Sequence, residues 1–266
     1  MITRTAVRRT TQQILILGLL ISIPIPTLAQ PDAPMESAAG SAEEKPWSVE
    51  IAPYLWLAGV DAELTTPSGG SISSSQTFSS IASNFDAGFA GAIDLRFRRL
   101  HVFSDNTWIR LKDSSERPGP AVTSIDLTLQ TAFGTVAAAY ELPLPGPVGL
   151  DVYLGARWWV MSTEVTQFNG GTAIASGDAK QVWADAVGGL RVRYAITDDW
   201  RIAMTGDVGG GGSELTWMVT GSLNWMIWRH FGLTAGYRVL GVDYQANGWD
   251  VDLKQQGLLL GMVIAL

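Results

Sequence analysis

The chain has 266 residues, a formal net charge of −7 and no cysteine, and it is 47% hydrophobic but only 16% charged. An acidic chain without a basic stripe is not expected to bind nucleic acid, and the absence of cysteine excludes disulfides, thiol catalysis and cysteine-based metal sites. So sparse a charge, with only four lysines, is unusual for a water-exposed surface and favours a wall that faces an apolar medium.

The N-terminus has the pattern of an export signal. Arg4, Arg8 and Arg9 form a positive region, and residues 14–25 form an apolar segment that is too short to span a bilayer as a helix. We therefore expect residues 1–30 to be a signal peptide that is removed on export. The alternative is a segment that is retained as a membrane anchor.

The next segment, residues 31–46, is rich in Ala, Ser, Glu and Pro and shows no hydrophobic period. This composition predicts a short disordered lead. The remainder, residues 47–266, is expected to form one domain.

From Trp47 onward, bulky apolar residues alternate with small or polar ones, most clearly in residues 215–225, 231–239 and 258–266. A period of two indicates β-strands with one face in an apolar medium. No later run of about 20 apolar residues could form a spanning helix. The fold class expected is therefore all-β, an antiparallel transmembrane β-barrel of about ten strands, with eight as the alternative. The predicted strands are 47–64, 87–98, 101–113, 123–141, 150–167, 179–196, 200–208, 214–228, 231–244 and 255–266.

The connections between these strands alternate in length, as in outer-membrane barrels with short periplasmic turns and longer outer loops. The longer connections are predicted at residues 65–86, 114–122, 168–178 and 245–254. Pro53 lies inside the first strand and cannot donate to a ladder, so a bulge or kink is expected there. Residues 101–113 have no clean apolar face, which predicts a bulge or register shift.

If the apolar face points to lipid, the opposite face gathers charges of both signs in the lumen. Arginine rather than lysine supplies the positive charge, and its planar fork suits paired carboxylates. A narrow barrel favours a structural ion-pair network over a polar pore with selective charges, although both remain open. The candidate site residues are Glu50, Asp94, Arg96, Asp126, Asp151, Arg157, Asp185, Arg191, Arg193, Asp207 and Arg238.

Enzymatic and metal-binding chemistry find little support in the sequence. The two histidines, His101 and His230, lie beside predicted short turns and are interpreted as interfacial polar residues. No ligand spacing predicts a metal, and no cofactor is expected. The function expected is a small outer-membrane barrel with a structural or narrow-pore, porin-like role. The alternatives are a lipid-modifying outer-membrane enzyme and a surface adhesin that uses the serine-rich residues 65–86.

Three motifs resemble uncharacterised proteobacterial outer-membrane barrels that are distantly similar to the outer membrane protein A-like families. The motifs are Trp47 with Pro53-Tyr54-Leu55-Trp56, then Gly206 to Gly210 with Ser213 and Thr216-Trp217, and then Gly236 to Leu240 with Asp243-Tyr244. The resemblance implies a Gram-negative outer membrane, contact with its lipid and insertion by the barrel-assembly machinery. It implies no reaction, ligand or catalytic residue. Such barrels usually end in Phe, whereas this chain ends in Leu266.

Overall fold

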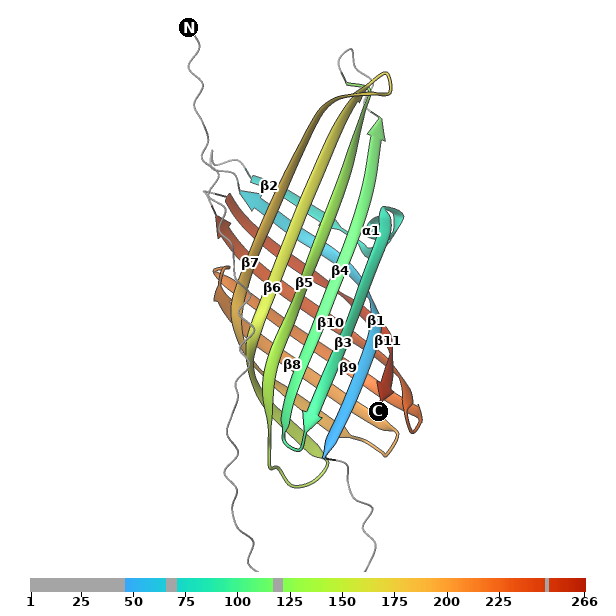
Figure 1. Ribbon diagram of the computed structural model, residues 1–266, viewed down its shortest axis with the longest axis vertical. Helices are drawn as coiled ribbons and strands as arrows, with labels where there is room; N and C mark the ends of the chain where they lie inside the picture. Colours follow the sequence, from blue (N-terminus) through green and yellow to red (C-terminus); the bar gives the residue numbers. More distant parts are fainter. Residues whose placement is uncertain (1–45, 66–70, 117–121, 247–248) are drawn as a thin grey trace, which may run out of the picture. The chain divides into compact units, whose positions relative to one another are not determined.

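The computed structural model describes residues 46–65, 71–116, 122–246 and 249–266, which form a closed antiparallel barrel of ten strands (Figure 1). Neighbours in sequence pair with one another, and β11 pairs with β1 to close the barrel. The predicted fold class is therefore confirmed. The expected signal peptide, residues 31–45 of the expected lead, and parts of three predicted loops lie outside the described residues. The barrel strands are β1 (Trp47–Thr65), β3 (Phe85–Phe97), β4 (Leu100–Glu116), β5 (Ser124–Leu142), β6 (Val148–Asn169), β7 (Thr172–Ala195), β8 (Trp200–Gly211), β9 (Leu215–Trp228), β10 (Phe231–Ala246) and β11 (Trp249–Ala265).

Two short elements follow β1 inside the predicted 65–86 loop: the strand β2 (Ser71–Gln76) and the helix α1 (Phe78–Ser83). Thr77 caps α1, because its hydroxyl accepts a hydrogen bond from the backbone N–H of Ser80. In the described part of the chain, no helix is long and apolar enough to cross a membrane.

The outer wall of the barrel is apolar, and the inner face holds the buried side chains. On β6, Tyr153 and Trp159 are buried, while Leu154 between them is 73% exposed on the outside. On β11, Leu258, Leu260 and Met262 are likewise exposed. The residues that alternate in the sequence therefore point alternately into a lumen filled with side chains and onto an apolar outer surface that suits lipid.

Replacing Leu260 with Arg is expected to destabilise the barrel by about 2–4 kcal/mol in lipid, the cost of a charge on the lipid face near the bilayer centre. Leu260 is 46% exposed and pairs with Leu55 of β1 and Ala235 of β10. Reversible unfolding in lipid vesicles would measure the loss. A variant as stable as the native chain would contradict the outward assignment of Leu260.

The link predicted at residues 168–178 is wrong, because β6 and β7 continue until they are separated only by Gly170 and Gly171. These glycines have φ values of 58° and 82°, which suit a two-residue hairpin turn. The serine and alanine residues after Gly171 obscured the strand pattern. As a result β4 to β7 extend beyond the other strands, at the end of the barrel opposite the one where β1 begins (Figure 1).

The bulge or register shift predicted within residues 101–113 is found only in the pairing of β4 with β3. β4 pairs with β5 without interruption from Leu100–Tyr140 to Glu116–Ser124. Its faces looked mixed because the inner one includes Asp105 and Thr107, which have partners in the lumen, while polar Asn106 is on the outer one. The ladder with β3 shifts opposite Arg110 and Leu111, because β3 has an extra residue, Asp86, between Phe85 and Ala87.

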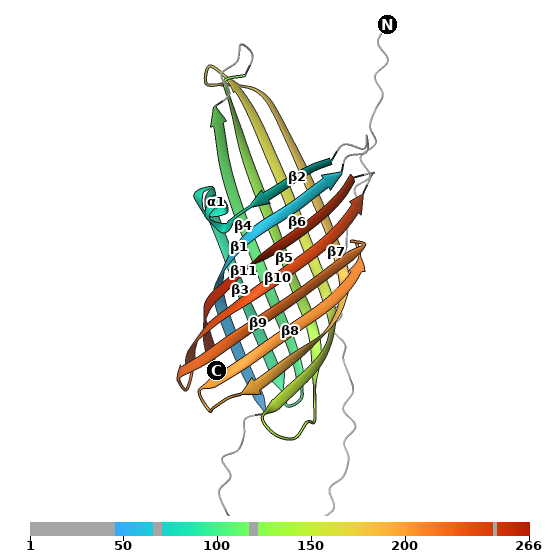
Figure 2. The ribbon, with the colours of Figure 1, turned by 180° about the vertical axis from the view of Figure 1, so that it is seen from behind.

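Pro53 marks the point at which β1 and β3 part. Pairing between these strands runs from Trp47–Phe97 to Pro53–Gly91, and β1 then pairs with β2 from Val60 onward. Proline lacks the N–H that a ladder needs, which explains why pairing ends at this residue. Figures 1 and 2 show β1 and β3 side by side at one end of the barrel and diverging toward α1.

Candidate functional site

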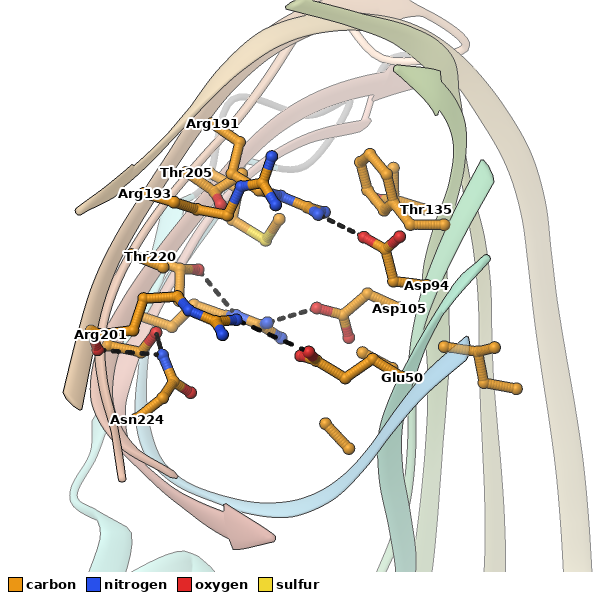
Figure 3. Close-up of a pocket in the computed structure, with 18 residues that line it drawn as sticks. Glu50, Asp94, Asp105, Thr135, Arg191, Arg193, Arg201, Thr205, Thr220 and Asn224 are labelled. Carbon is orange, nitrogen blue, oxygen red and sulfur yellow. Dashed lines mark hydrogen bonds and ion pairs between the residues drawn. The ribbon is translucent and has the colours of Figure 1, made fainter. Parts of the chain in front are cut away.

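The lumen contains a small polar pocket at the terminal end, defined as the end of the barrel where Trp47 and Ala265 lie. This pocket has a volume of about 190 Å³. Figure 3 shows that Arg191, Arg193 and Arg201 project from one wall, and Glu50 and Asp94 from the opposite wall. Most of the ion pairs that cross the pocket therefore join strands that are far apart in sequence.

Seven ionisable side chains meet at this end in the terminal cluster. Arg191 contacts Asp94 at 2.5 Å, while Arg193 contacts both Glu141 at 3.0 Å and Asp151 at 2.8 Å. Arg96 reaches the same Glu141 at 2.8 Å. The members of the terminal cluster are Asp94, Arg96, His101, Glu141, Asp151, Arg191 and Arg193.

His101 occupies the centre of the terminal cluster, so its interpretation as an interfacial residue is wrong. The side chain is buried, and its Nδ1 lies 3.1 Å from Asp94. Its Nε2 lies 3.6 Å from Glu141 and 3.9 Å from Asp151. It escaped sequence reasoning because it is the second residue of β4, beside a turn, where both faces are often wet.

His101, Glu141 and Asp151 also place one ligand atom each within 4.8 Å of one another, a spacing that could hold a metal ion. Arg193 already donates to both carboxylates. Three arginines also balance the three acids of the terminal cluster without a further cation. The geometry therefore fits an ion-pair cluster better than a metal centre.

Two ion pairs, one fully buried and one partly buried, cross the lumen between the terminal cluster and the far end of the barrel, and we call them the central pairs. Arg157 donates from Nη2 to both oxygens of Asp207 at 2.7 and 2.8 Å, and also to Thr135 and Thr216. Tyr153 donates to the same carboxylate at 2.9 Å. Every described hydrogen bond of this first pair is made between fully enclosed groups, so it is a dry, charge-assisted network.

Arg238 forms the second central pair, with Asp105 of β4. The guanidinium also donates to the hydroxyl of Tyr54 at 2.7 Å and to Thr220 at 3.1 Å. Tyr54 in turn donates to Asp105. This network joins β1, β4, β9 and β10, so it ties together opposite walls of the barrel.

Five aromatic rings pack against one another in the lumen beyond the central pairs and form the aromatic layer. Successive ring centroids lie 5.9, 4.8, 5.5 and 4.2 Å apart, distances at which aromatic rings attract one another. The buried indole N–H groups of Trp56, Trp159 and Trp183 have no hydrogen-bond partner among the described residues. In order across the lumen, the layer consists of Trp56 (β1), Phe133 (β5), Trp159 (β6), Trp183 (β7) and Tyr244 (β10).

The structure places most of the predicted site residues in the lumen, with two corrections. Glu50 lies near Arg201 at a separation of 3.8 Å, and its side chain is partly exposed. Asp185 is buried but makes no described ion pair; it accepts the backbone N–H of Ser213 at 2.6 Å and so fixes the β8–β9 turn. Asp126 is exposed and lies on the opposite face of β5 from Phe133, because the two positions differ by an odd number. The predicted residues found in the lumen ion pairs are Glu50, Asp94, Arg96, Asp151, Arg157, Arg191, Arg193, Asp207 and Arg238.

Sequence reasoning missed several partners of these residues. Asp105 and Tyr153 were not among the predicted site residues, and Thr216 was named only as part of a motif. A signal was available on β6, whose inward positions Asp151, Tyr153, Arg157 and Trp159 pass through all three layers in order. The aromatic layer could not be derived, because its members come from five separate strands.

No family model and no curated protein matches this chain. Among solved structures, the outer membrane protease OmpT from Escherichia coli is 9% identical, with a TM-score of 0.53 over 87% of this chain and 99% of that chain. The translocator domain of the autotransporter NalP from Neisseria meningitidis is 9% identical, with a TM-score of 0.42 over 82% and 90%. Ail from Yersinia pestis is 11% identical, with a TM-score of 0.36 over 84% and 99%. At these identities the likeness to OmpT shows the fold alone, that of an outer-membrane β-barrel.

Proposed function

We propose that this chain is a structural β-barrel of the Gram-negative outer membrane, whose lumen is sealed against the passage of solutes. The observation that carries this proposal is the succession of wall-to-wall contacts: the terminal cluster, the central pairs and the aromatic layer. Trp159 and Arg157, which lie in consecutive inward positions of β6, are both fully buried. A solute would have to displace both the ion pairs and the stacked rings.

The proposal includes export by the expected signal peptide, insertion by the barrel-assembly machinery and contact with outer-membrane lipid. It also includes membership of the proteobacterial barrels that the sequence resembles. The apolar outer wall supports the contact with lipid. The proposal assigns no reaction to the chain. The likeness to OmpT adds no support for catalysis, because it extends to the fold alone.

A narrow pore is the second candidate, and the arginine-lined pocket at the terminal end favours it. The two candidates predict different electrical behaviour. We expect the refolded mature chain to insert into planar bilayers without steady openings. Heat-modifiability on gels would confirm that the inserted protein is folded. Regular, charge-selective openings would overturn the sealed barrel and make Arg191 and Arg193 candidates for the selectivity of a pore.

A further inference from the structure

The gap between β1 and β3 opens into a second, larger cavity, which lies in the barrel wall. Residues 54–59 of β1 pair with β11 on one side and have no β3 partner on the other, although both strands are described there. β2 and α1 approach this edge of β1 closely: a Cβ on Gly59 would lie 2.9 Å from the backbone oxygen of Gln76. The wall is therefore covered by a short strand and a helix where a continuous ladder is missing.

The cavity has a volume of about 480 Å³, within the range of about 300–1,000 Å³ for small-molecule sites. It connects the outer surface with the lumen. Leu55 and Phe89, on the two sides of the gap, are 66% and 63% exposed outside and also line the cavity. At its inner end lie Phe133, Met161 and Leu253, which belong to or pack against the aromatic core of the lumen.

The lining is mostly apolar and includes no Asp, Glu, Lys, Arg or His. An ionised ligand would lose its hydration there without gaining a counter-charge, which is costly. A hydrocarbon chain would lose nothing by leaving the surrounding lipid, since both environments are apolar. The chemistry therefore selects a long-chain ligand with a neutral head.

Two buried polar atoms of the lining have no hydrogen-bond partner among the described residues: Nε1 of Trp56 and Oε1 of Gln255. Gln255 pairs in register with Val60, and Val60 lies on the same face of β1 as Trp56. Both side chains therefore point to the same side of the wall. An amide oxygen accepts a hydrogen bond and a hydroxyl donates one, so a hydroxyl head suits Oε1 of Gln255.

We propose that this cavity binds a single-chain amphiphile with a neutral hydroxyl head, of the long-chain alcohol class, which enters from the surrounding lipid through the gap between β1 and β3. The chain packs on Phe133, Met161 and Leu253. The hydroxyl head donates a hydrogen bond to Oε1 of Gln255. The cavity shares Trp56 and Phe133 with the aromatic layer, but labelling measures ligand binding and conductance measures the seal, so the two proposals can succeed or fail independently.

Photocrosslinking tests the proposal with the mature chain refolded in phosphatidylcholine vesicles. The probe is a hexadecanol that carries a diazirine in its chain, and mass spectrometry locates the labelled residues. We expect labelling at Phe133 and Met161, which excess hexadecanol suppresses and hexadecyl sulfate, with its charged head, does not. Labelling confined to outward residues such as Leu154 would indicate surrounding lipid alone and would overturn the proposal.

Ala90→Phe supplies a variant that fills the cavity, because Ala90 lines it opposite Thr107. The matched control is Ala138→Phe, at an exposed position of β5 that does not line the cavity. We expect Ala90→Phe to lose at least about tenfold in labelling of Met161, a change worth roughly 1.4 kcal/mol, while Ala138→Phe keeps it. Equal labelling in the two folded variants would contradict the site.

Gln255→Leu tests the head group without adding bulk, and it serves if Ala90→Phe does not fold. Loss of one hydrogen bond is expected to weaken suppression by hexadecanol roughly fivefold. Competition by hexadecane, which has no head to bind, should be unchanged in the same variant. A Gln255→Leu barrel that hexadecanol protects as well as the native chain would show that this residue does not hold a hydroxyl head.

Discussion

Replacing Arg157 with alanine is expected to lower the free energy of unfolding by about 3–5 kcal/mol, the cost of removing one partner of a buried ion pair. Arg157 and Asp207 are both fully enclosed, and the guanidinium also satisfies Thr135 and Thr216. Without Arg157, the Asp207 carboxylate keeps one hydrogen-bond donor among the described residues, the hydroxyl of Tyr153. Urea unfolding in lipid vesicles, followed by tryptophan fluorescence, would measure the change.

Two further variants separate the effect of burial from the effect of charge. Arg201→Ala removes an arginine whose side chain is about half exposed and 3.8 Å from Glu50, so a loss of no more than about 1 kcal/mol is expected. Replacing both members of the central pair, as Arg157→Met with Asp207→Leu, should recover much of the stability, since no charge is then left alone. If Arg157→Ala cost no more than Arg201→Ala, the central pair would not be a dry interaction.

The strands were predictable from the sequence because a barrel imposes one rule on nearly every residue. Leu258, Leu260 and Met262 face lipid and their neighbours do not. The period of two can therefore be recognised in the sequence before the paired strands are known. The same rule fails in the hairpin of β6 and β7. The residues after Gly171 are mostly small or polar, which is not the pattern of a strand that faces an apolar medium. Only the two glycines of the turn indicate where the strands end.

The site was predictable only in part, because alternation gives the face of a residue but not its partner. Arg238 was expected inside, yet its contacts with Tyr54 and Asp105 join positions 184 and 133 residues away. Asp126 was misplaced because a charged residue was assumed to avoid the outer face, whereas it lies in an exposed part of β5. Pro53 gave a correct local signal, the loss of a donor, but it could not reveal that β3 would depart there.

The second large effect is expected from Trp159→Ala, which removes the central ring of the aromatic layer. Trp159 is 0% exposed and stacks between Phe133 and Trp183, so its truncation leaves a cavity that the neighbouring rings fill only in part. The expected loss in the free energy of unfolding is about 3–5 kcal/mol. The same unfolding assay measures it.

The adjacent Trp158 offers a matched control, since it has the same side chain and lies on the outer face of β6. Lipid chains can occupy the space that its ring leaves, so Trp158→Ala should cost roughly 1 kcal/mol, as for substitutions outside a packed core. A large difference between these neighbours would mean that the lumen is the core of this protein, with its stability concentrated where a pore would need open space. Equal losses would mean that the aromatic layer packs loosely, and a sealed lumen would then lose its main physical support.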